Sequence, residues 1–103
     1  MKQRRVVVTG LGALTPVGNT APEFWSNLLE GKSGAAPITR FDTTKFKTKF
    51  ACEVKNYDPL NYFEKQDVRK IDPFTQYALI TADEAIRDAG LELDKIDKTR
   101  VGV

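Results

Sequence analysis

The feature that most constrains the fold is an apolar run that breaks into glycines near the N-terminus, VVVTGLGALTPVGN at residues 6–19. Val6, Val7 and Val8 are consecutive β-branched residues, which favour a strand. A continuous apolar run of this kind is typical of a strand covered on both faces, as in a parallel sheet. We therefore predict a strand over residues 5–9 with fully buried valines, followed by a loop over residues 10–20.

The two glycines after the valines raise the question of a nucleotide site. Gly10 and Gly12 match the first two positions of the dinucleotide-binding pattern G-x-G-x-x-G, but the third position is Thr15. The next helix is expected to start only near Ala21, too late to meet a pyrophosphate directly. We therefore interpret the glycines as positions where the backbone turns and packs closely. A non-catalytic nucleotide- or partner-binding module at residues 10–18 stays as an alternative.

Two helices are expected from apolar spacing and end signals. The first starts near Thr20 or Ala21, carries Pro22 in its first turn and ends at Gly31. The second spans residues 73–89. Its capping and breaking residues are Asp72, Pro73 and Gly90, and its apolar positions are Phe74, Tyr77, Ala78, Ala82, Ala85, Ile86 and Ala89. The alanines predict close packing against a neighbouring segment.

The rest of the chain shows weaker signals. Residues 51–55 are consistent with a short strand, a helical turn is expected at Asp58-Pro59, and residues 65–71 favour a short helix. A second strand is expected at residues 101–103. Because a strand–helix–strand order favours parallel pairing, the fold class is α/β. Two strands cannot form a sheet with both faces covered, so we expect residues 1–103 to be part of something larger or to associate with another chain.

Composition excludes several functions. The chain has no histidine and one cysteine, Cys52, so it cannot assemble a Ser-His-Asp triad, a Cys-His pair or a histidine-based zinc site by itself. Cys52 lies in the context KFACEVKNY and has no histidine to activate it, which favours an ordinary cysteine without a catalytic role. No apolar run approaches the length of a membrane span, and no metal site is expected.

Five segments, in order, resemble one enzyme family. They are VVVTGLGALTPVGN, the helix with Phe24 and Trp25, GKSG at 31–34, Phe41-Asp42, and DVRKIDPFTQYAL at 67–79. Together they are similar to the N-terminus of the β-ketoacyl-acyl carrier protein synthases, nearest to the type II elongation enzymes of bacterial fatty acid synthesis. The resemblance covers all 103 residues, whereas the family's chains are far longer.

The resemblance implies a thiolase-like fold with α/β/α/β/α layers, of which residues 1–103 are the N-terminal segment of the first half. It implies a cytoplasmic homodimer that needs no cofactor. Its reaction is a decarboxylative Claisen condensation of acyl and malonyl groups on acyl carrier protein, through a cysteine thiolate assisted by two histidines. Those residues lie beyond residue 103 in the family, so no catalytic residue is expected here. A ketosynthase of polyketide assembly is the alternative with the same chemistry.

The basic middle of the chain is the candidate binding region. Residues 45–70 carry seven basic and four acidic side chains, a net charge of +3. Acyl carrier proteins are acidic, and the resemblance implies Lys65, Arg69 and Lys70 as docking residues. Lys65 and Arg69 share one face if the stretch is helical. Second-line candidates are Lys45, Lys47 and Lys49. On charge alone a solvated helix is the simpler interpretation, and no pattern predicts nucleic-acid binding.

Overall fold

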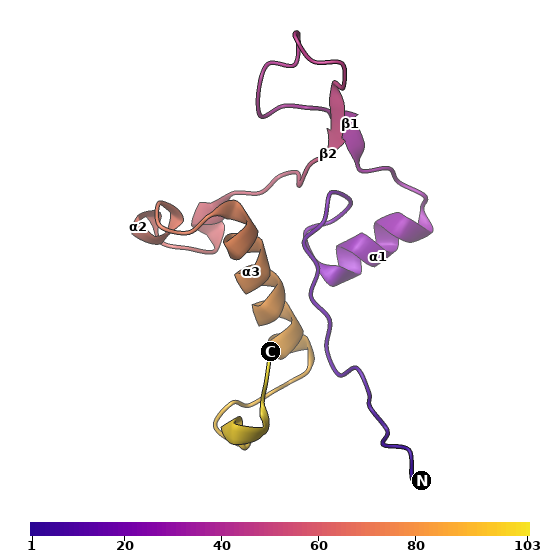
Figure 1. The fold of residues 1–103 in the computed structure, drawn as a ribbon, viewed down its shortest axis with the longest axis vertical. Helices are drawn as coiled ribbons and strands as arrows, with labels where there is room; N and C mark the ends of the chain where they lie inside the picture. The colour runs from indigo at the N-terminus through magenta and orange to yellow at the C-terminus, as the bar shows by residue number, and fades with distance from the viewer.

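Helices and irregular segments dominate the fold, and only one small sheet is present (Figure 1). A computed structural model describes residues 1–103. The elements in chain order are α1 (Ala21–Leu29), β1 (Ala35–Pro37), β2 (Phe50–Cys52), the 3-10 turn η1 (Pro59–Asn61), α2 (Lys65–Val68), α3 (Pro73–Asp88) and the 3-10 turn η2 (Lys98–Arg100).

Helix α1 begins and ends at the predicted signals. The extended Thr20 caps it, and the Thr20 hydroxyl accepts a hydrogen bond from the Glu23 amide at 3.3 Å. Pro22 occupies the first turn, where its missing amide costs nothing. Past the last turn, Gly31 adopts φ +69°, a conformation that glycine reaches without strain. The prediction of this helix is confirmed.

Helix α3 is the longest element, with 16 residues, and it too follows its predicted signals. Asp72 stands at the N-cap with extended backbone, although its carboxylate caps no amide. Pro73 begins the helix, and Gly90 turns the chain away after it with φ +62°. Ile80 on this helix is the only buried hydrophobic side chain of the chain. The two buried side chains of the molecule, Gln76 and Ile80, therefore both belong to α3.

The sheet differs from the predicted parallel arrangement. Strands β1 and β2 pair antiparallel, with Ala36 opposite Ala51, and residues 38–49 connect them in a loop that projects away from the helices (Figure 1). The strand predicted at 51–55 is thus present but shifted and shortened. The β1 strand was not predicted, because Gly34 and Pro37 are residue types that strands disfavour. An antiparallel pair forms here because the loop of residues 38–49 reverses the direction of the chain between the two strands.

The two terminal strands predicted from sequence are not formed. Val6, Val7 and Val8 are 92%, 65% and 80% exposed, so the prediction that they are fully buried is wrong for this chain. Residues 101–103 likewise have no strand partner. The physical reason is that a strand needs a neighbour to satisfy its amides and carbonyls, and β1 and β2 pair only with each other.

The chain does not enclose a core of its own. Its radius of gyration is 17.8 Å, whereas a compact domain of this length has about 13 Å. Large apolar side chains such as Trp25 and Leu29 on α1 are 61% and 71% exposed. No helix is both long and apolar enough to cross a bilayer. Residues 1–103 therefore present apolar faces that further protein can cover.

Candidate functional site

The glycine loop lies directly against the backbone of α3. A Cβ atom at Gly10 would stand 2.2 Å from the carbonyl oxygen of Ala85, and one at Gly12 would stand 2.0 Å from that of Thr81. Both distances are far inside contact range, so only glycine fits at either position. The interpretation of these glycines as close-packing positions is confirmed, and so is the close approach predicted for the alanine face of α3.

Two carboxylates on α3 bind backbone amides of the glycine loop and of the first residue of α1. Glu84 accepts hydrogen bonds from the Ala13 amide and from the Ala21 amide, both at 2.8 Å. Asp88 accepts one from the Leu11 amide at 2.9 Å. Two acidic groups that face the loop would repel an incoming phosphate. This arrangement counts against the nucleotide-binding alternative for residues 10–18.

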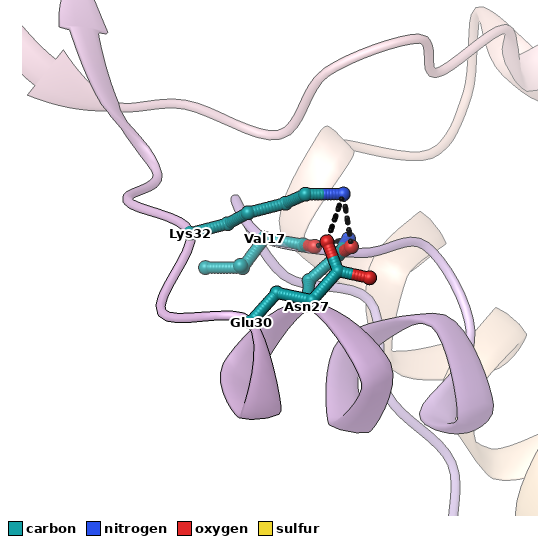
Figure 2. Close-up of polar contacts among 4 residues, drawn as sticks. All are labelled: Val17, Asn27, Glu30 and Lys32. Atoms are coloured by element: carbon teal, nitrogen blue, oxygen red, sulfur yellow. Dashed lines mark hydrogen bonds and ion pairs between the residues drawn. The ribbon is translucent and has the colours of Figure 1, made fainter.

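The same loop is attached to α1 and to the small sheet by amide and ammonium groups. The Asn27 side chain on α1 donates to the Val17 carbonyl, while Lys32 pairs with Glu30 at 2.9 Å and donates to Asn27 Oδ1 at 3.0 Å (Figure 2). A separate cation, Lys55, follows β2. Its Nζ donates to the carbonyls of Pro16, Gly34 and Glu53 at 3.2, 2.6 and 3.1 Å.

A cleft of about 660 Å³ opens between the loop, the start of α1 and α3. Leu11, Tyr62 and Ile80 contribute to its walls. Its carboxylates are the same Glu84 and Asp88 that bind backbone amides, so both groups have a structural role in holding the loop and α1 against α3.

The three predicted docking cations lie together on a short segment outside α3. Lys65 starts α2, Arg69 follows its last residue with helical backbone angles, and Lys70 is the next residue. All three side chains are exposed, and none forms an ion pair. Residues 64–72 also carry three acids, so the segment is neutral overall. Recognition of an acidic partner here would depend on how the cations are arranged.

Local hydrogen bonds explain why the segment folds this way. Asp58 caps the η1 turn by accepting a hydrogen bond from the Leu60 amide at 3.0 Å. At the other end, the Asp67 carbonyl accepts from the amides of Lys70 and Ile71 at 2.9 and 3.1 Å. The helical turn therefore continues past Arg69 and brings Lys65 and Arg69 onto one face. The helical turn predicted to open at Asp58-Pro59 is present as η1, and the short helix predicted at 65–71 is present but shorter, as α2.

The buried side-chain amide of Gln76 on α3 contacts the residues that flank the segment 58–70 on both sides. The hydroxyl of Tyr57 donates to Gln76 Oε1 at 2.6 Å, and Gln76 Nε2 donates to the Ile71 carbonyl at 2.9 Å. Tyr57 also stacks on Tyr62 with ring centroids 5.9 Å apart and meets Tyr77 edge-on at 5.1 Å. Partial burial, followed by the two neighbouring phenols, raises the pKa of Tyr57, so its hydroxyl keeps its proton and remains a donor.

The remaining sequence candidates lie elsewhere. Lys45, Lys47 and Lys49 are exposed in the loop between β1 and β2, where Lys49 Nζ donates at 3.4 Å to the carbonyls of Thr43 and Thr44. The structure does not place them on the α2 segment. Cys52 is an exposed free thiol at the end of β2.

Several structural residues were missed from the sequence. Glu84 and Asp88 stand four residues apart on one helix face, which was a visible signal, but nothing local indicated that this face meets the glycine loop. Nothing in the sequence distinguished Gln76 from the exposed polar residues of α3. Its partner Tyr57 lies 19 residues away, beyond the reach of helical periodicity.

Comparison with known proteins places the chain in a family. Residues 3–103 match the family described as "Beta-ketoacyl synthase, N-terminal domain". The chain is 47% identical over its whole length to 3-oxoacyl-[acyl-carrier-protein] synthase 2 of Coxiella burnetii, and 50% identical to the protein of the same name from Vibrio harveyi. In both cases it spans about a quarter of the relative's length, 25%.

Two solved structures have a similar backbone. One is the ishigamide ketosynthase/chain length factor, with a TM-score of 0.81 and 39% identity over 92% of this chain and 24% of that one. The other is a type II PKS acyl-carrier protein in complex with its ketosynthase bound to the hexaketide, with a TM-score of 0.70 and 30% identity over 96% of this chain and 22% of that one. The predicted α/β, thiolase-like fold class is confirmed by these ketosynthase neighbours. The chain belongs to the β-ketoacyl synthase N-terminal domain family.

Proposed function

We propose that the complete protein is a 3-oxoacyl-acyl carrier protein synthase that elongates fatty acids. The observation that carries this proposal is the 47% and 50% identity, over the whole chain, to two proteins named 3-oxoacyl-[acyl-carrier-protein] synthase 2. Relatives of that name range from 39% to 50% identity, while the two ketosynthases of solved structure are 39% and 30% identical. Among these, the highest identities are to the synthase 2 proteins, which supports fatty acid elongation over the polyketide alternative.

The proposed chemistry proceeds in two transfers. A cysteine thiolate attacks the carrier-bound acyl thioester and releases the carrier thiol. The malonyl group on a second carrier then loses carbon dioxide, and the resulting carbanion attacks the enzyme thioester. A carbon–carbon bond forms, the cysteine leaves, and the product is the β-ketoacyl carrier. The two assisting histidines come from outside residues 1–103, since this chain has no histidine, and the family resemblance assigns the nucleophilic cysteine to a later segment as well.

Residues 1–103 contribute scaffold and part of the carrier-docking surface in this proposal. We assign them to the N-terminal segment of the first thiolase-like half, in a homodimer. The exposed apolar faces support an arrangement in which further protein covers them. The free thiol of Cys52 is consistent with the cytoplasm, where cysteines stay reduced.

Lys65, Arg69 and Lys70 are the proposed contacts to acyl carrier protein. They are exposed, unpaired and carried on one short segment, as a surface for an acidic partner requires. The solved complex of a related ketosynthase with its acyl-carrier protein supports a carrier as the partner class. Exposed charges of this kind act mainly on encounter rate and salt dependence.

Charge reversal in the complete enzyme tests the docking role. Lys65→Glu combined with Arg69→Glu should raise the apparent KM for acyl carrier protein substrates about fivefold or more, with little change for short free thioesters. Lys95→Glu combined with Lys98→Glu makes the same change of net charge outside the α2 segment and serves as the control. Equal loss of activity with both kinds of thioester, or no change with either, would show that the segment does not dock the carrier.

A further inference from the structure

Gln76 is an unusual residue in this chain because it is polar and almost completely buried. Its side chain is 3% exposed in a structure where Ile80 is the only buried hydrophobic residue. A buried amide is costly unless its donors and acceptors find partners. Gln76 uses both ends, accepting from the Tyr57 hydroxyl at 2.6 Å and donating to the Ile71 carbonyl at 2.9 Å.

The positions of these two partners in the chain matter more than the bonds themselves. Tyr57 directly precedes the segment 58–70, and Ile71 directly follows it. One side chain on α3 therefore holds both ends of the segment that carries Lys65, Arg69 and Lys70. Fixing both ends of a short segment removes much of its conformational freedom before any partner binds.

We propose that Gln76, together with Tyr57, is a positioning residue for the carrier-docking segment. This inference rests on the proposed docking function and deepens it. Gln76 itself is buried and does not contact the carrier. It acts by keeping α2 in the orientation in which the exposed cations match an acidic surface, so that the carrier does not have to order the segment when it binds.

Loss of the Gln76 hydrogen bonds would have a specific kinetic consequence. If the segment is only partly ordered, the apparent affinity for the carrier is the intrinsic affinity multiplied by the fraction of molecules in which the segment is correctly placed. Substrates that do not use the segment are unaffected. Loss of the anchor should therefore raise KM for carrier substrates while kcat, and KM for free thioesters, stay nearly constant. A residue that only stabilises the fold would not separate the two substrate classes.

Two variants of the complete enzyme test this. Gln76→Leu keeps the approximate volume and removes both hydrogen bonds, and it should raise the carrier KM about threefold or more. Tyr57→Phe removes one hydroxyl and keeps the ring stack, with an expected rise of about twofold. Tyr62→Phe is the matched control, because Tyr62 belongs to the same aromatic cluster and its hydroxyl makes no hydrogen bond within the chain. Its KM should not change.

The outcomes separate the two proposals. If Gln76→Leu does not fold, Tyr57→Phe still decides, since it removes only one oxygen. An unchanged carrier KM in Tyr57→Phe, or an equal loss with free thioesters, would overturn the positioning role even if charge reversal at Lys65 and Arg69 weakens the carrier. If that charge reversal itself has no effect on the carrier KM, the docking function is wrong and the positioning inference fails with it.

Discussion

Two irregular segments are attached to α3 by different means. The glycine loop lies along its second half, where Gly10 and Gly12 bring backbone against backbone and Glu84 binds two amides. The segment 58–70 is attached to its first half through side chains, chiefly the hydrogen bonds of Gln76 and the edge-on contact of Tyr57 with Tyr77. The loop contact leaves no room for a side chain at Gly10 or Gly12 and includes no cation of the loop, which is typical of scaffold. The second segment keeps its cations exposed, as recognition requires.

The largest expected effect comes from breaking the loop contact. Gly12→Ala places a methyl group 2.0 Å from the Thr81 carbonyl oxygen. That oxygen belongs to the backbone of α3, so it cannot move aside as a flexible side chain could. The complete protein should lose about 3 kcal/mol or more of unfolding free energy, measured by denaturant unfolding. Ser26→Thr adds one methyl group on the exposed side of α1 and should change stability by about 0.5 kcal/mol or less. Comparable stabilities for the two variants would mean that the loop does not touch α3.

A smaller effect is expected at the carboxylate that binds the loop. Glu84→Gln preserves shape, but its NH2 group cannot accept from an amide, so one of the Ala13 and Ala21 amides loses its partner. The expected loss is about 1–3 kcal/mol of unfolding free energy. Asp83→Asn on the same helix removes only an exposed ion pair with Arg87 and should cost less than about 1 kcal/mol. A larger loss of unfolding free energy from Asp83→Asn than from Glu84→Gln would contradict the role of Glu84 in holding the loop.

The helices could be predicted from the sequence because their signals are local. Thr20, Pro22 and Gly31 mark α1 from its cap to its stop, and Pro73 and Gly90 bound α3 in the same way. The predicted terminal strands failed because a strand depends on a neighbour that the sequence pattern does not contain. The valines at 6–8 have the composition of a covered strand, yet nothing within residues 1–103 covers them.

The candidate site was also partly predictable. The cations Lys65, Arg69 and Lys70 were named from family resemblance, and the structure places them together and exposed. The groups that hold them were not predictable, since the contact of Gln76 with Tyr57 joins residues from separate elements. The same holds for Glu84, whose partner Ala21 lies 63 residues earlier in the chain. Contacts of this kind depend on tertiary packing.

The most direct test of the contrast between the two segments is amide hydrogen exchange of the complete enzyme with and without acyl carrier protein. Binding should slow exchange in peptides that cover residues 64–72, because the carrier would shield and order that segment. Peptides that cover residues 10–20 should exchange at the same rate in both states, since the loop is already packed on α3. Slower exchange in the glycine loop, with residues 64–72 unchanged, would contradict the assignment of α2 as the docking surface.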